Sequence, residues 1–227
     1  GIVTSPKAAA LRDVLTTLLA HDDDLHLPPA VLRREIAFFL LAGAHTSATA
    51  FVRTLHHVLT MATTRPADHE KACTDLAFLQ RCVHETVRLQ PSSPIAMRWA
   101  LSDIELSGGV HVPEGSRLVI DLMAVNRDPS VFGPDADDFD PRRPLPSGVA
   151  PWGRSLGLGM HACIGQDLAA GVDPLGREVA EDHLYGLVPV AVRAVLDAGA
   201  VPDPEDPPTL DPDTTRGYWG RYPVLFP

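Results

Sequence analysis

Cysteine is scarce in this sequence, and the scarcity narrows the kinds of protein it can encode. Only three of the 227 residues are cysteines, Cys73, Cys82 and Cys163, and no two of them are close together. An odd count without close pairs argues against a disulfide framework and favours a reducing compartment. The sequence also lacks Cys-x-x-Cys and His-Glu-x-x-His spacings, which disfavours the common zinc sites. We therefore expect a cytoplasmic chain.

Long apolar runs and an excess of positive charge are missing as well. The longest apolar run, Ile36 to Ala44, falls short of the roughly 18 residues that a membrane span requires. No charged-then-apolar stretch opens the sequence, so we predict neither a signal peptide nor a membrane span. The net charge of -10 disfavours nucleic acid as a partner, because phosphate binding needs a basic surface.

The hydrophobic pattern predicts a mainly helical chain. A pattern without proline runs from Ala30 to about Thr63, a helix on the order of 50 Å long at 1.5 Å per residue. Its middle, Ile36 to Ala44, is apolar on every side, so we expect this helix to run through the core. Further helices are predicted over Ala8 to Ala20, Cys73 to Leu89, Gln166 to Ala170, and Val188 to Leu196.

The remaining segments predict a small β region and a long loop. From Arg98 to Val125, β-forming residues alternate with Gly and Pro, which indicates short strands and turns. Asn126 to Trp152 is rich in Pro and Gly and predicts an ordered loop, and Tyr218 to Phe226 predicts a last strand. The expected fold class is mainly α with a small β region, in a single domain over residues 1–227.

One cysteine lies in an unusual setting, the stretch GLGMHACIG from Gly157 to Gly165. A free cysteine is most often a small buried hydrophobe. Here Gly157, Gly159 and Gly165 allow close backbone approach and positive φ, so a flat ligand could lie against the loop. The helix predicted from Gln166 would place Cys163 near a helix N-terminus, where a thiolate is stabilised. A single thiolate suffices as the axial ligand of haem iron.

This loop resembles the signature of the cytochrome P-450 haem-thiolate monooxygenases, Phe-x-x-Gly-x-(His or Arg)-x-Cys-x-Gly. Residues 156–165 match it except at the first position, where Leu156 replaces phenylalanine. The resemblance implies the C-terminal, haem-binding half of the cytochrome P-450 fold and haem b as cofactor. Cys163 would be the metal ligand, and His161 would reach a haem propionate.

Other stretches carry the same resemblance. Glu85 and Arg88 match the Glu-x-x-Arg pattern of the family, and Arg143 in FDPRRP matches the arginine that completes a buried cluster. We predict these three as structural supports of the haem pocket, although an exposed helix salt bridge is the common alternative for such a pair. Arg98 corresponds to a propionate-binding arginine in both spacing and order.

The stretch from Ala42 to Ser47 resembles the oxygen-activating segment of the family. A threonine hydroxyl can bond back to a carbonyl one turn earlier and open a local bend. Thr46 matches the family threonine that helps to deliver protons, but His45 replaces the usual acid. Histidine can relay protons near neutral pH, and it is equally often a packing residue, so both interpretations of His45 remain open. His56, His57 and His84 are expected at the surface.

The resemblance implies a monooxygenase that inserts one oxygen atom of O2 into a small, largely apolar substrate, with electrons from a ferredoxin-type partner. Phe38, Ala42 and Ile95 are candidates to face that substrate. The N-terminal helices of the fold have no counterpart, so Phe38 to Leu41 should be exposed and need a complementary N-terminal chain or a second copy. The alternatives are a non-catalytic activator or scaffold, and a haem-binding fragment or sensor without turnover.

Overall fold

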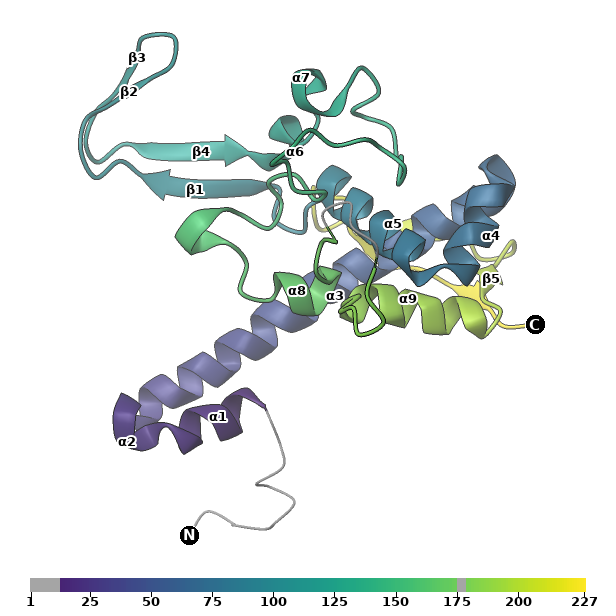
Figure 1. Ribbon diagram of the computed structural model, residues 1–227, viewed down its shortest axis with the longest axis horizontal. Helices are drawn as coiled ribbons and strands as arrows, with labels where there is room; N and C mark the ends of the chain where they lie inside the picture. Colours follow the sequence, from purple (N-terminus) through teal and green to yellow (C-terminus); the bar gives the residue numbers. More distant parts are fainter. Residues whose placement is uncertain (1–12, 175–178) are drawn as a thin grey trace. The chain divides into compact units, whose positions relative to one another are not determined.

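The computed structural model describes residues 13–174 and 179–227 (Figure 1). The helices of these residues are α1 (Val14–Ala20), α2 (Asp22–Leu25), α3 (Pro29–Thr64), α4 (Pro66–Thr74), α5 (Leu76–Leu89), α6 (Leu122–Val125), α7 (Pro129–Phe132), α8 (Gln166–Ala170) and α9 (Leu187–Asp197). The strands are β1 (Ile95–Trp99), β2 (Ile104–Leu106), β3 (Val110–Val112), β4 (Arg117–Asp121), β5 (Val201–Pro202), β6 (Thr209–Leu210), β7 (Trp219–Arg221) and β8 (Val224–Leu225). A mainly helical chain with a small β region is confirmed.

The described chain divides into two compact units, the first ending at Thr46 and the second running from Ser47 to Pro227. The first unit contains α1, α2 and the beginning of α3. Asp13 caps α1, because its carboxylate accepts the N–H of Thr16 at 2.8 Å. The predicted helix from Ala8 to Ala20 is therefore present from Val14 on, and residues 8–12 lie outside the described residues.

The long helix α3 follows its prediction to within one residue at each end. Its buried side chains all come from the later part, Ala50 to Met61. The apolar middle is exposed instead, with Phe38 at 55%, Leu40 at 69% and Leu41 at 74%. The prediction that this stretch runs through the core is therefore wrong, because residues 13–174 and 179–227 leave these three side chains largely uncovered. The expected exposure of residues 38–41 is confirmed for Phe38, Leu40 and Leu41, whereas Phe39 is half-buried.

An 18-residue window of α3 has a mean hydropathy of 1.4. Among the described residues, it is the one helix long and apolar enough to cross a membrane. A core helix of a water-soluble protein meets the same criterion, so length and composition alone do not place α3 in a bilayer.

The core of the second unit forms where α3, α5 and α9 pack together. Val58 and Met61 of α3, Leu79 and Val83 of α5, and Val192 of α9 are all nearly inaccessible to solvent. The predicted helix Cys73–Leu89 ends as expected but is two helices, α4 and α5. The division comes from Asp75, whose carboxylate accepts the N–H groups of Ala77 and Phe78 and so begins a new helix.

The strands form four antiparallel pairs, β1–β4, β2–β3, β5–β8 and β6–β7. The predicted β region is present but starts earlier, at Ile95, and its last residues form the short helix α6. The predicted loop from Asn126 to Trp152 contains one helical turn, α7. The predicted last strand is two short strands, β7 and β8, because each pairs with a different partner.

His84 is not at the surface as predicted. It is 3% exposed, since α5 is buried on nearly every side, and burial lowers the pKa of its ring to about 4. His56 and His57 are half-buried on α3, so their expected surface position is wrong as well. The Nδ1 of His56 lies 3.1 Å from the hydroxyl of Tyr222, and the ring of His57 stacks on Phe139.

Candidate functional site

The Cys163 loop is a closed turn held by its own backbone. The N–H of Cys163 donates to the carbonyl of Leu156 at 2.7 Å, which ties the two ends of the loop together. Between them, Gly159 to His161 form a single 3-10 turn. The N–H of Gln166 donates to the carbonyl of Cys163 at 3.2 Å, and α8 begins there. The cysteine therefore lies between a rigid turn and a helix start, as the sequence predicted.

Glycine is required at one position of this loop. Gly157 has φ +74°, and a Cβ on it would lie 2.7 Å from the carbonyl oxygen of His161. Gly159 also has positive φ, +60°, but a Cβ there would meet nothing within 4 Å. Gly165 has φ -97°, so the expectation of positive φ is wrong at this position, since Gly165 immediately precedes α8 with an ordinary backbone conformation.

The surroundings of Cys163 fit a large apolar ligand. The thiol belongs to an exposed residue, and Met160 at 93% and Ile164 at 80% are also exposed beside it. Gly159 and Gly165 leave open space where other residues would carry a side chain. A soft sulfur ligand with apolar neighbours suits an iron porphyrin, whose faces are apolar and whose iron accepts thiolate. Leu156 packs against the hydrophobic core of the second unit.

The two residues predicted to bind the haem propionates, Arg98 and His161, are both exposed. Arg98 lies on β1 opposite Leu118 of β4, and its guanidinium donates to the neighbouring carbonyl of Met97 at 2.8 Å. His161 ends the 3-10 turn and is exposed. Ile95, predicted to face the substrate, is exposed at the start of β1.

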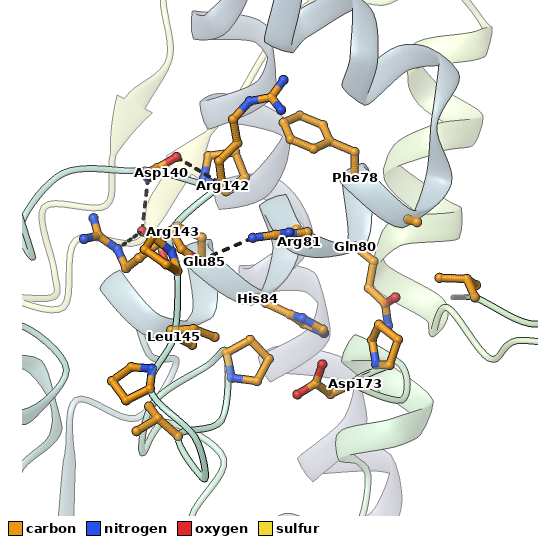
Figure 2. A pocket seen from close by; sticks show the side chains of 18 of the residues that line it. Phe78, Gln80, Arg81, His84, Glu85, Asp140, Arg142, Arg143, Leu145 and Asp173 are labelled. Atoms are coloured by element: carbon orange, nitrogen blue, oxygen red, sulfur yellow. Dashed lines mark hydrogen bonds and ion pairs between the residues drawn. The ribbon is translucent and has the colours of Figure 1, made fainter. Parts of the chain in front are cut away.

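Glu85, Arg88 and Arg143 meet in a buried cluster (Figure 2 shows Glu85 and Arg143). Arg88 donates from Nε and Nη2 to the two carboxylate oxygens of Glu85, at 2.7 and 2.8 Å. Arg143 donates to the same carboxylate at 3.2 Å, and the N–H of Asp140 adds a further bond at 3.0 Å. Arg143 also donates to the carboxylate of Asp135, which keeps the pKa of Asp135 below its usual value.

Sequence reasoning missed the residues that join this cluster to the Cys163 loop. Asn126 is fully buried, and its amide nitrogen donates to the carbonyl of Arg88 at 2.9 Å and to the hydroxyl of Ser155 at 2.7 Å. Its amide oxygen accepts the N–H of Arg154 at 2.7 Å, and Ser155 donates to the carbonyl of Val87 at 2.6 Å. An asparagine before Arg-Asp-Pro was visible in the sequence, but nothing local indicated its burial.

A cavity of about 900 Å³ lies beside α5, and Glu85 and Arg143 of the buried cluster are among its lining residues (Figure 2). Its walls are the side chains of α5 around Phe78, Arg81 and His84, the proline-rich segment 140–151, and Asp173 with Pro174. These walls contain both positive and negative side chains. No residue of the loop 156–165 lines this cavity, so it is separate from the cysteine site.

The predicted oxygen-activating residues lie in the first unit. The hydroxyl of Thr46 donates to the carbonyl of Ala42 at 2.6 Å, the back-bond that the sequence predicts, and α3 continues through this point without interruption. His45, Ala42 and Phe38 are exposed. Among residues 13–174 and 179–227, no three metal-ligating side chains form a cluster, so a single cysteine remains the candidate metal ligand.

Comparisons with known proteins identify the family of the chain. The sequence model of the family described as cytochrome P450 matches residues 4–170 of the chain. The indoleacetaldoxime dehydratase of Arabidopsis thaliana is 28% identical over 198 residues, 77% of this chain and 39% of that protein. Cytochrome P450 714C2 of Oryza sativa subsp. japonica is 38% identical over 111 residues, 46% of this chain and 21% of that protein.

Solved structures show the same fold. CYP154A1 from Streptomyces coelicolor A3(2) superposes with a TM-score of 0.68 at 24% identity, over 97% of this chain and 50% of that chain. P450BioI, solved in complex with a ligated acyl carrier protein, superposes with a TM-score of 0.71 at 23% identity over the same shares. The chain thus spans less than half of these curated relatives and about half of these solved structures. The fold, the buried Glu85 cluster and the family match over residues 4–170 together show that this chain belongs to the cytochrome P450 family.

Proposed function

We propose that this chain is the haem-ligating portion of a monooxygenase, a single domain in which Cys163 binds the iron of haem b. The observation that carries the proposal is the Cys163 loop, a closed backbone turn that presents an exposed thiol among exposed apolar side chains. A haem held by a thiolate supplies the chemistry that cleaves the O–O bond, because the sulfur donates electron density to the iron.

The neighbouring residues would hold the porphyrin. The exposed guanidinium of Arg98 and the ring of His161 would bind the propionates as cationic or hydrogen-bonding partners. Gly157, Gly159 and Gly165 would let the backbone approach the porphyrin face, which side chains would otherwise keep at a distance. Glu85, Arg88 and Arg143 would support the haem pocket by fixing the backbone between residues 126 and 140, since Glu85 accepts one backbone N–H there and each arginine donates to several carbonyls.

Thr46 and His45 are the proposed proton-handling residues. The hydroxyl of Thr46, which donates to the carbonyl of Ala42, would hold and pass on a proton during catalysis. His45, the neighbouring exposed residue on α3, would supply that proton. Phe38, Ala42 and Ile95, all exposed, would face a small, largely apolar substrate.

The reaction would use O2, two protons and two electrons from a ferredoxin-type donor in the cytoplasm, with one oxygen atom entering the substrate and the other leaving as water. The exposed face of Phe38, Leu40 and Leu41 would pack against a polypeptide corresponding to the preceding half of the family fold. Co-purification of such a polypeptide, and its loss on Leu41→Glu substitution, would support this part of the proposal. A second copy of the chain is the alternative partner.

A second candidate reaction is the loss of water from an oxime, which requires no electrons. Two observations favour it: the chain resembles a protein named as an indoleacetaldoxime dehydratase, and His45 replaces the usual acid. Turnover of an oxime without an electron donor would identify this reaction. Haem without any turnover would identify a sensor, and a chain without haem would identify an activator or scaffold.

The experiment that tests the proposal is the absorption spectrum of the reduced carbon monoxide complex. Haem-loaded wild-type chain should give the thiolate-type spectrum, and Cys163→Ala should lose it. Cys73→Ala is the matched control, because Cys73 is a half-buried free cysteine on α4. Retention of the thiolate-type spectrum in Cys163→Ala refutes the ligand assignment.

A further inference from the structure

The helix that follows the Cys163 loop ends after five residues. α8 stops at Gly171, which has φ +79°, and the chain returns at Gly186 to begin α9. The residue four positions beyond Ala170 is Pro174, which has no N–H to donate to the Ala170 carbonyl. A buried carbonyl at a helix end needs a donor from another part of the protein. The carbonyl of Ala170 is such a group, because Ala170 is buried.

The residues directly after α8 are in close contact with the residues directly before α9. The N–H of Val172 donates to the carbonyl of Leu184 at 2.9 Å. A Cβ on Gly171 would lie 2.2 Å from the carbonyl oxygen of Tyr185, and a Cβ on Gly186 would lie 2.3 Å from the nitrogen of Gly171. There is no space for a side chain at either glycine, so the C-terminal end of α8 is fixed in place.

Two side chains of α5 supply the missing donors. The amide nitrogen of Gln80 donates to the carbonyls of Ala170 and Val172, both at 3.1 Å, and Nε2 of His84 donates to the carbonyl of Ala170 at 2.9 Å. Gln80 and His84 lie one turn apart on the same face of α5 (Figure 2). Nε2 of His183, 3.1 Å from the amide oxygen of Gln80, donates to it and so orients the amide nitrogen toward the two carbonyls.

The protonation state of His84 suits this role. Burial lowers the pKa of the ring to about 4, so the ring is neutral near pH 7 and carries one N–H. Ala170 offers only an acceptor, which places that hydrogen on Nε2. Gln80, His84 and Ala170 are each at most 3% exposed, so removing either donor would leave the buried Ala170 carbonyl with fewer hydrogen bonds.

We propose that Gln80 and His84 are positioning residues for the Cys163 loop. They clamp the carbonyl of Ala170, the buried residue of α8, and thereby hold the helix and the loop ahead of it against α5. α5 also carries Glu85 and Arg88, whose side chains hold the segment between residues 126 and 143. The part of this inference that concerns haem rests on the proposed function; the clamp itself does not.

Amide hydrogen exchange of the chain without haem tests the clamp. In Gln80→Met and in His84→Phe, the amides of Ala169 and Gly171, which donate to Gly165 and Asp167, should exchange about tenfold faster relative to amides within α5. Met and Phe fill similar volumes but donate no hydrogen bond. Cys82→Ala is the matched control: it removes a buried atom from the opposite face of α5 and should leave this ratio unchanged. Equal acceleration of α8 and α5 amides, or no acceleration, overturns the clamp.

The haem-loaded chain tests the consequence for the thiolate. The thiolate-type spectrum of the reduced carbon monoxide complex should convert to the form without thiolate about tenfold faster in Gln80→Met and His84→Phe. His84→Gln, which keeps a neutral N–H donor, should restore the wild-type rate. An unchanged rate in both clamp variants contradicts the positioning role. This outcome differs from failure of the proposed function, in which the wild-type chain itself would show no thiolate-type spectrum.

Discussion

Arg88 and Glu85 form a two-point ion pair inside the protein, with Nε to Oε2 at 2.7 Å and Nη2 to Oε1 at 2.8 Å, and neither side chain is more than 5% exposed. Arg88 also donates to the carbonyls of Asn126 and Ala136 and lies over the ring of Phe132. One guanidinium therefore connects α5 to the loop between residues 126 and 136.

Replacing Arg88 with lysine should destabilise the protein strongly. A single ammonium cannot make the two-point contact, and the carboxylate of Glu85 would remain buried with fewer donors. We expect a loss of about 3 to 5 kcal/mol of unfolding free energy, measured by denaturant titration. The matched control is Arg193→Lys, because Arg193 pairs with the exposed Asp197 at 2.6 Å and should cost less than about 1 kcal/mol. Equal losses in the two variants would contradict the structural role of the cluster.

Alanine should be tolerated differently at two glycines of the Cys163 loop. Both Gly157 and Gly159 have positive φ, so alanine costs about 1 to 3 kcal/mol of backbone strain at each. Gly157→Ala adds a 2.7 Å contact with the backbone oxygen of His161, whereas Gly159→Ala meets open space. Thermal unfolding should therefore show the lower midpoint for Gly157→Ala. The same midpoint for both variants would mean that the loop relaxes freely.

Thr46 offers a test of the proposed proton delivery. Thr46→Ser keeps the hydroxyl that bonds to Ala42 and should retain most activity, while Thr46→Val keeps the shape and loses the hydroxyl. We expect Thr46→Val to lower product formation at least about 100-fold and to release peroxide instead. The measurement is product and peroxide per electron pair consumed. Identical product yields in the valine and serine variants would exclude the hydroxyl from proton delivery.

His45 can be tested separately from Thr46. His45→Asp introduces the acid of the family pattern, and His45→Leu removes any proton carrier. If His45 relays protons, the aspartate variant should keep turnover, because a carboxyl group can also carry a proton. The leucine variant should release peroxide. A leucine variant with wild-type product yield would assign His45 to packing.

Acid should destabilise the chain through His84. Its pKa is lowered from 6.5 to about 4 by burial, so the unfolded state binds more protons between these values. The contribution of a neutral His84 is therefore complete above about pH 6.5 and is lost as the pH falls toward 4, to the order of 3 kcal/mol. His84→Gln keeps a donor without a titrating group, so its stability should fall less over this range. The measurement is the unfolding free energy of the wild type and of His84→Gln, from denaturant titrations at several pH values. The same pH dependence in both proteins would contradict the role of His84 in the loss of stability.

The parts of the structure that depend on local signals were predictable from the sequence. Prolines at 29 and 66 bracket α3, and the spacing of Glu85 and Arg88 places them on one face of α5. The glycines around Cys163 indicated a turn that only glycine accommodates, correctly at Gly157. These features need only a few neighbouring residues, which is why a single sequence sufficed.

The remaining features depend on contacts between distant residues. His84 is buried because α8, 86 positions later in the chain, brings the carbonyl of Ala170 against it. Asn126 connects Arg88 to Ser155, and neither neighbour is close in sequence. Whether Phe38 is buried or exposed depends on which elements pack against α3. The apolar pattern of α3 does not specify those elements.

The most direct measurement is X-ray absorption at the iron edge of the haem-loaded chain, which identifies the atoms bonded to the metal. A protein thiolate should appear as one sulfur scatterer in the wild-type chain and in Cys73→Ser, and it should be absent from Cys163→Ser. A sulfur scatterer that persists in Cys163→Ser, or a wild-type iron without one, would contradict the assignment of Cys163 as the haem ligand.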